Sequence, residues 1–142
     1  MAAVLTLAQQ LDALITRIRE QVPGLKSVVG MEDLDEAMET TELLPAAVVI
    51  WSGDYPEKPA PGLSTHAGQK INRYWSAIVV LELTLGPAEP LDLLEAVENS
   101  GVGWRPCRGA RFLAAAGKRF VAKFDKTRVV YEVRVGTMTT TT

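Results

Sequence analysis

Cysteine and histidine are almost absent from this 142-residue chain, which has Cys107 and His66 as its single residues of these types. One cysteine excludes an internal disulfide framework, and one histidine removes most sites in which several imidazoles hold a transition metal. No stretch approaches the roughly 20 apolar residues of a membrane-spanning helix, so we expect no membrane contact. The N-terminal segment lacks the basic start of a secretory signal, so we expect synthesis in a reducing cytoplasm.

Motifs for catalysis or nucleotide binding are missing as well. A nucleophilic site would need Ser64 or Cys107 within reach of His66, with a third group to orient the base, and no spacing places them together. A phosphate-binding loop ending near Gly117 would need another glycine five positions earlier, where Phe112 stands. We therefore predict that the chain is not an enzyme and holds no cofactor and no metal.

The composition is that of one globular domain, because 47% of the residues are hydrophobic and 23% are charged. Apolar residues recur at three- and four-residue spacing over 7–22, which predicts an amphipathic helix. Thr6 and Gln9 have the spacing of a capping box at its start, and Pro23 follows its end. Shorter helices are expected over 31–42 and from Pro90 to about 99.

Six segments have strand patterns: 25–29, 44–51, 71–85, 111–115, 118–124 and 128–135. On the fifth, Phe120 and Phe124 are predicted to face the core, and Arg119 and Lys123 to face solvent. The order of elements predicts a single α+β domain over 1–136, with a mixed, antiparallel-rich sheet and helices packed on one face. A flexible Thr-rich tail is expected over 137–142. The loop over 54–69, which holds three prolines, is interpreted as functional or mobile.

The net charge of −2 conceals a division along the chain. Residues 1–99 carry 6 basic and 15 acidic side chains, a net charge of −9, whereas residues 100–142 carry 9 basic and 2 acidic ones, a net charge of +7. No Lys or Arg occurs between residues 27 and 57, where the acidic helix is expected. This helix is a solvated face, a divalent-cation site, which the missing calcium-loop spacing disfavours, or a surface that a cationic partner stabilises.

The basic partner is present in the same chain, which favours a head-to-tail contact between copies. Such contacts close into rings when the rotation between subunits permits. The outer face of the 71–85 strand would add an apolar centre to the contact. The side chains expected there are Glu32, Asp35, Glu36, Glu39, Ile78, Val80, Arg111, Arg119, Lys123 and Arg128. The alternative is a small module that binds nucleic acid or another protein through its basic C-terminal hairpin.

A series of segments resembles the tail terminator, or tail completion, proteins of tailed bacteriophages. The series consists of the amphipathic first helix, Val22-Pro-Gly-Leu-Lys-Ser-Val-Val29, the short helix around Asp33-Leu34, Leu44-Pro-Ala-Ala-Val-Val-Ile50 with the Gly53-Asp54 turn, Trp75 at the start of the long strand, Val102-Gly-Trp-Arg-Pro106, and Phe124 followed by Val129-Val-Tyr-Glu-Val133. The resemblance covers roughly residues 5–135.

The resemblance implies a structural virion protein without catalytic residues. Such a protein forms a hexameric ring on the end of the completed tail tube, stops tube polymerisation and presents the surface that joins the tail to the head. The partners that it implies are further copies of the chain, the tail tube protein and the head–tail connector proteins. Nucleic acid would be met at most indirectly, through the tube lumen. The location would be the head-proximal end of the virion tail, after assembly in the host cytoplasm.

Overall fold

The computed structural model describes residues 5–33, 44–56, 69–82, 88–105, 111–123 and 126–141. Its elements are, in chain order, α1 (Leu7–Gln21), β1 (Ser27–Val29), the 3-10 helix η1 (Met31–Asp33), β2 (Ala46–Pro56), β3 (Gln69–Glu82), α3 (Ala88–Gly101), β4 (Ala114–Lys123) and β5 (Arg128–Thr141). The five strands form one sheet in the order β1-β2-β3-β5-β4, in which only β1 and β2 pair in parallel. This arrangement confirms the predicted α+β fold.

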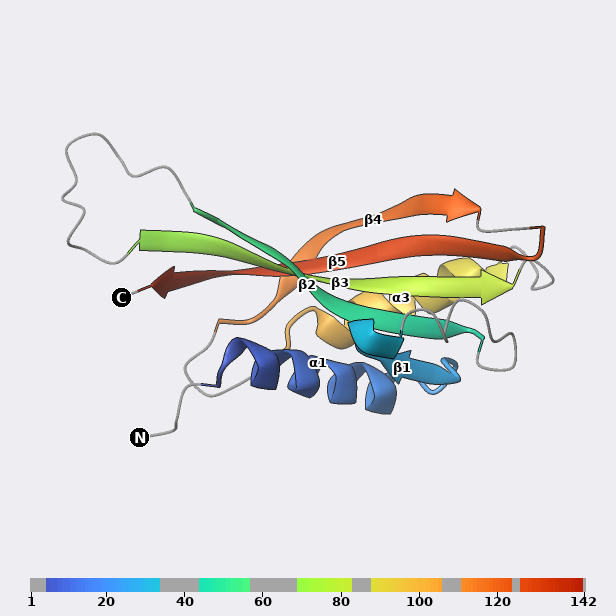
Figure 1. Cartoon of the computed structure of the whole chain (residues 1–142), viewed down its shortest axis with the longest axis horizontal. Coiled ribbons are helices and arrows are strands. Elements are labelled where there is room, and N and C mark those ends of the chain that lie inside the picture. Colours follow the sequence, from blue (N-terminus) through green and yellow to red (C-terminus); the bar gives the residue numbers. More distant parts are fainter. Residues whose placement is uncertain are drawn as a thin grey trace.

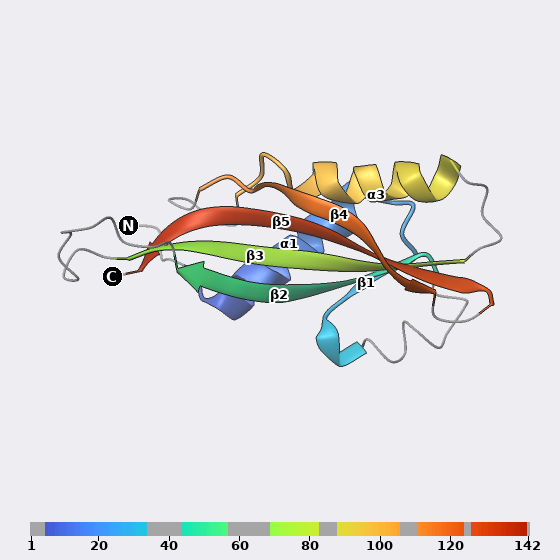
Figure 2. The same ribbon diagram turned by 90° about the horizontal axis from the view of Figure 1, so that it is seen from above.

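Both described α-helices pack on the same face of the sheet (Figure 1; Figure 2). The first begins where the sequence predicts, because Thr6 and Gln9 form the expected capping box. The Thr6 hydroxyl accepts the Gln9 N–H at 3.2 Å, and the Gln9 side chain accepts the Thr6 N–H at 2.9 Å. The apolar stripe of α1 then buries Leu14 and Ile18 against the sheet.

The main core lies between the helices and the sheet and is centred on β3. Trp75, Ala77, Val79 and Leu81 alternate along this strand and are all buried, as its period of two predicts. Trp75 is the largest fully buried side chain and is only 2% exposed. Burying an aromatic side chain of this size contributes about 2–3 kcal/mol, so the centre of β3 is a main source of stability.

The sequence predicts that this strand ends before Ser52-Gly53, but β2 continues to Pro56. It passes the glycine through a β-bulge: Trp51 pairs with Trp75, the next paired residue is Gly53, and Ser52 is the extra residue. Gly53 has a φ of 142°, a conformation that residues with a Cβ rarely adopt. The inserted residue reverses the alternation of the side chains that follow it. Side chains after the bulge therefore point to the opposite faces from those that an unbroken strand would give them.

A single strand, β4, replaces the two strands predicted on either side of Gly117. A bulge between Ala115 and Gly117 lets the chain continue, and Gly117 has a φ of 121°. The prediction that Phe120 is a core residue is wrong: it lies on the helix-covered face, but it is 56% exposed because β4 is the outer strand. Phe124 lies outside the described residues.

The strands β3 and β5 pair along fourteen residues, from Gln69–Thr141 to Glu82–Arg128. Their outer ends, together with the end of β2, reach past α1 (Figure 1; Figure 2). Residues 137–141 therefore belong to β5, and the flexibility expected of that tail stays a prediction. Most of the expected helix over 31–42 and of the proline-rich loop lies outside the described residues.

Candidate subunit interface

The structure describes one of the four acidic side chains expected at a subunit contact. Glu32 lies in η1, directly after β1, and its side chain is exposed. Asp35, Glu36 and Glu39 lie outside the described residues. Because η1 contacts β2, Glu32 lies on the β1–β2 side of the sheet, opposite to β4.

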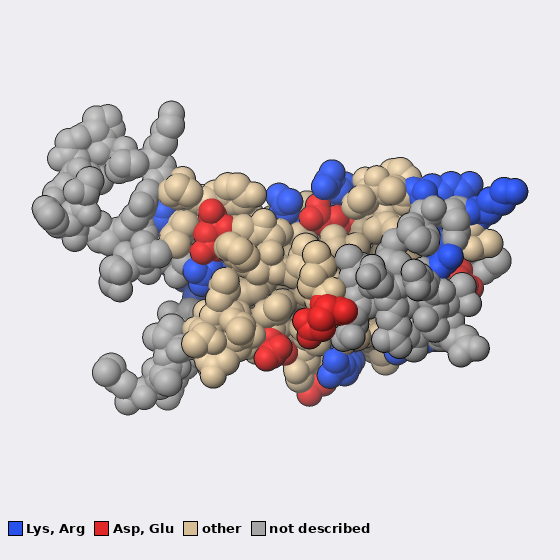
Figure 3. All heavy atoms as spheres, in the orientation of Figure 1, with Lys and Arg blue, Asp and Glu red and all other residues tan. Residues whose placement is uncertain are grey.

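The four expected basic side chains lie on or beside the two C-terminal strands. Arg111 is exposed just before β4, Arg119 and Lys123 are exposed within β4, and Arg128 is the half-buried first residue of β5. Lys and Arg side chains gather at the end of the molecule where these strands meet (Figure 3). The basic set and Glu32 therefore occupy opposite sides of the sheet.

The cations of β4 do not share one face. Lys118 and Lys123 pair in register with buried valines of the helix-covered face, whereas Arg119 pairs with Glu132 on the other face. Lys118 donates a hydrogen bond of 2.6 Å to Glu98 of α3. This division gives no single row of cations of the kind that follows a phosphate backbone.

Only one of the two apolar side chains expected at the centre of the contact is partly exposed. Val80 is fully buried within the single chain, so the prediction that it is exposed is wrong. It lies between Ala46 and Val130 in the sheet register and belongs to a second, smaller apolar cluster on the face opposite α1 and α3. Ile78 is half-buried at the margin of the same cluster.

A buried charge, which the sequence interpretation missed, lies on this second face. Glu132 is only 7% exposed, and its carboxylate accepts hydrogen bonds of 2.8 Å from the Ser76 hydroxyl and from Nε of Arg119. A guanidinium nitrogen of Arg134 lies 3.6 Å from Oε2 of Glu132. Arg119, expected to be available to a partner, is therefore already paired, although its side chain stays 67% exposed. The alternation of charged and apolar residues in β5 indicates on which face of the sheet Glu132 lies, but it does not indicate that the side chain is buried.

The neighbours of Glu132 determine its pKa. Burial alone raises the pKa of a carboxyl group, because it disfavours the charged form. The hydrogen bonds from Arg119 and Ser76, with the positive charges of Arg134 and Arg119, outweigh burial and lower the pKa of Glu132 below its ordinary value. Glu132 is thus a carboxylate at neutral pH, and it fastens β3, β4 and β5 to one another.

A second charged group holds the bulge of β2 in place. Asp54 accepts two hydrogen bonds of 2.8 Å from the Arg73 guanidinium and one of 2.9 Å from the Trp51 indole. The Arg73 hydrogen bonds are the main cause of the lowered pKa of Asp54. The exposed Trp51 is therefore fixed in position at the edge of the sheet by a contact that bridges the bulge.

Hollows lie beside β4 on both faces of the sheet, a small one of about 220 Å³ beside Arg119 and Glu132 and two larger ones. The helix-side hollow has a volume of about 370 Å³ and lies between α3 and β4, with Leu91, Phe120 and Tyr131 in its lining. The hollow on the other face has a volume of about 500 Å³ and is lined by Ala114–Ala116 and Tyr74, among others. Both larger hollows are open to solvent and adjoin the outer strand of the sheet.

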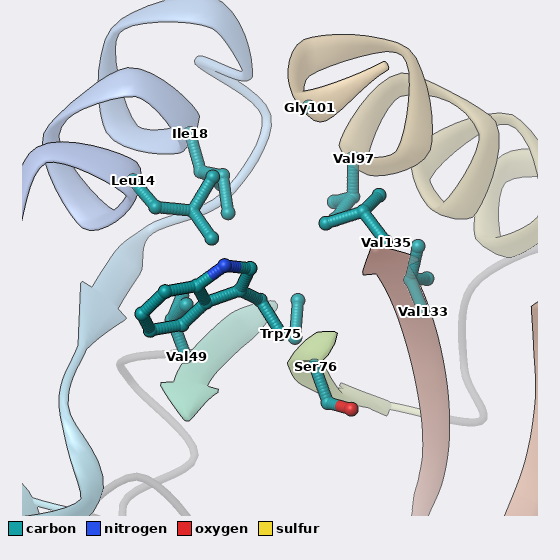
Figure 4. A pocket seen from close by; sticks show the side chains of 10 residues that line it. Leu14, Ile18, Val49, Trp75, Ser76, Val97, Gly101, Val133 and Val135 are labelled. Carbon is teal, nitrogen blue, oxygen red and sulfur yellow. The ribbon is translucent and has the colours of Figure 1, made fainter. Parts of the chain in front are cut away.

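A much smaller cavity lies in the core between the helices and the sheet. This apolar cavity of about 10 Å³ lies beside Trp75, between Leu14 and Ile18 of α1 and Val97 of α3 (Figure 4). A volume of this order holds at most one water molecule, and the apolar lining offers that water few partners. The cavity is a small packing defect and is not a ligand site.

Among the described residues, no three His, Cys, Asp or Glu side chains are placed to hold a metal ion. Ser64, His66 and Cys107, weighed as a nucleophilic group, all lie outside those residues. Within the same ranges, no helix is long and apolar enough to cross a membrane.

Comparison with known protein families gives a match over most of the chain. Residues 7–134 match the model of a family described as phage tail terminator protein. None of the curated proteins compared with the chain matches it.

Proposed function

Because the chain belongs to the phage tail terminator family, we propose that it caps the phage tail tube as a ring of identical subunits. The family is one of structural proteins of the virion tail. In the proposed role the ring, a hexamer, stops the addition of tube subunits and presents a surface to the connector proteins of the head. It lies at the head-proximal end of the tail after assembly in the host cytoplasm, and DNA meets it only through the lumen of the tube.

The observation that carries the proposal is the extent of the family match. It runs from the first residue of α1 into β5 and thus takes in the two described α-helices and four complete strands of the described sheet. A match confined to one motif would support the fold of a fragment. One that spans the whole packed domain supports the coarse role of the family for the chain as a whole.

The distribution of charge supports the ring. A head-to-tail contact needs two different surfaces on each subunit, which meet across every interface. The chain carries the exposed Lys123 on β4, at one edge of its sheet, and the exposed Glu32 beside the other edge. We therefore propose that the acidic segment that begins at Glu32 faces the basic strand β4 of the next copy.

Deletion of the gene from a phage that carries it tests the capping role. We expect abnormally long tails and tails without heads in electron micrographs, because nothing stops the addition of tube subunits. Supplying the gene in trans should restore tails of ordinary length. Normal, head-joined tails in the deletion strain would rule out the proposed function.

Charge reversal tests the electrostatic contact separately. Glu36→Lys together with Glu39→Lys should weaken ring formation, and Lys123→Glu in the same chain should restore part of it. Asp12→Lys together with Glu20→Lys is the matched control, since it changes the net charge equally on exposed residues of α1. Equal ring formation by both double variants, measured by crosslinking on purified tails, would contradict the electrostatic contact and leave the capping role intact.

A further inference from the structure

The sheet has two open backbone edges, and they are different. No described strand pairs with the outer edge of β4, and β4 is exposed at all ten of its residues. On the other side, β1 covers β2 only at Ala46–Val48 and Val49 is fully buried, so residues 50–56 of β2 form an outer edge with no described strand beside it. Open edges present unpaired N–H and C=O groups to which another strand can bind.

The two edges point away from each other. Figure 2 shows β2 and β4 on opposite sides of the sheet, as the strand order requires. A second copy that adds its β2 to β4 of the first leaves its own β4 free for a third. Each added copy is rotated in the same sense relative to the copy before it. Because the sheet is twisted, the series of copies curves and can close into a ring.

The direction of the strands fits such a series. Within the chain, β2 runs antiparallel to β3, β3 antiparallel to β5, and β5 antiparallel to β4, so β4 and β2 run in opposite directions. Copies related by rotation about an axis along the strands keep their directions. The β4 strand of one copy would therefore meet β2 of the next in an antiparallel pair, with the helices of both copies on one side.

Charge selects this pairing over its alternatives. Two β4 strands would bring Lys118, Arg119 and Lys123 of one copy against the same cations of the other, and like charges that face each other destabilise a strand pair. Residues 50–56 of β2 contain no Lys or Arg and include Asp54. The bulges of β4 also disfavour indiscriminate pairing with other strands.

The exposed aromatic side chains of β2 fit the hollows beside β4. Trp51 is 43% exposed and points to the helix-covered face, and Tyr55 is 53% exposed and points to the opposite face, because the bulge lies between them. In an antiparallel pair that places Trp51 against the hollow near Phe120, Tyr55 reaches the hollow lined by Ala114–Ala116. The small alanine side chains allow the two backbones to approach closely.

We propose that β4 of one subunit pairs antiparallel with residues 50–56 of the next, so that one continuous sheet runs around the ring. The occupant of each open edge is thus a second copy of this chain. The inference rests on the proposed ring, and it names the contact that builds it.

Disulfide trapping within assembled tails tests the pairing. In a Cys107→Ser background, Tyr55→Cys is combined either with Ala114→Cys or with Ala122→Cys. Both alanines are exposed and lie on the same face of β4, near opposite ends of the strand. Each variant is supplied in trans to the deletion phage, and its tails are purified, mildly oxidised and run on non-reducing gels.

We expect a ladder of crosslinked subunits with Ala114→Cys, converted to monomer by a reductant, and none with Ala122→Cys. A ladder with Ala122→Cys alone, or none with either pair on tails of normal length, would overturn the strand pairing while the capping role stands. Loss of the capping role itself would appear as normal tails in the deletion strain before any variant is supplied.

Discussion

Replacing Glu132 by glutamine keeps the shape of the side chain and removes the charge at the junction of β3, β4 and β5. The carboxylate accepts hydrogen bonds of 2.8 Å from Ser76 and from Arg119 and lies 3.6 Å from Arg134. A hydrogen bond to a charged group contributes about 1.5–3 kcal/mol. Arg119 is two-thirds exposed and regains water when the charge is removed, so its share is small.

We therefore expect Glu132→Gln to lower the free energy of unfolding at pH 7 by about 2 kcal/mol. Unfolding entropy of about 2.1 cal/mol/K per residue converts this loss into a fall in Tm of about 7 °C for a domain of this size. Thermal denaturation followed by circular dichroism measures it. The control is Glu98→Gln, which removes a carboxylate held by Lys118 on the surface and should cost less than about 1 kcal/mol.

Acidification gives the same experiment a second readout. The pKa of Glu132 is lowered in the folded state, so its stabilising effect is complete above the ordinary glutamate value of 4.5 and is lost as the pH falls through the folded-state pKa. The difference in stability between wild type and Glu132→Gln should therefore close in acid. A difference that stays constant from pH 7 to about pH 3 would refute the electrostatic reasoning, because it would mean that packing of the amide causes the loss.

Three further substitutions test other contacts by urea or thermal denaturation. Thr6→Ala removes the acceptor of the Gln9 N–H at the start of α1 and should cost about 1 kcal/mol. Gly136→Ala places a Cβ 2.7 Å from the Tyr74 ring and should cost about 1–3 kcal/mol, less in a Tyr74→Ala background. Asp54→Asn weakens the paired hydrogen bonds from Arg73 and should cost about 1–2 kcal/mol, with reduced crosslinking of the β2 edge in tails.

Each of the three has a matched control on a comparable residue. Thr16→Ala changes an exposed threonine in the middle of α1. Gly30→Ala meets only the flexible end of Glu32, at 3.6 Å. Asp92→Asn neutralises an exposed carboxylate of α3. Controls that lose as much stability as the test variants would show that the effects come from general sensitivity and not from the contacts described.

Local rules predicted the elements whose signals lie within their own residues. The spacing of apolar side chains and the Thr6–Gln9 pair gave the position and the start of α1. Strict alternation gave the core face of β3, from Trp75 to Leu81. These features depend on neighbours a few residues away, and hence they can be read without knowledge of the fold.

The wrong predictions concern features that depend on contacts between strands far apart in the sequence. Alternation assigned Phe120 to the inner face of its strand, but only the strand order shows that β4 is the outermost strand. Val80 was expected at the surface and is covered on the second face. The partners of Glu132 come from Ser76 and Arg119, 56 and 13 residues away in sequence, and no local pattern brings these groups together.

The length of β3 and β5 implies a gradient of local stability along the sheet. Their paired backbones continue beyond Trp75 and Val135, where the main core ends, and described side chains further out are at most half-buried. The amide protons of 70–73 should therefore exchange with solvent through fraying of the strand ends, whereas those of 76–81 should exchange only when the whole domain unfolds. A protein that binds the outer ends would slow exchange there first, and it would order that part of the sheet without any change in the core.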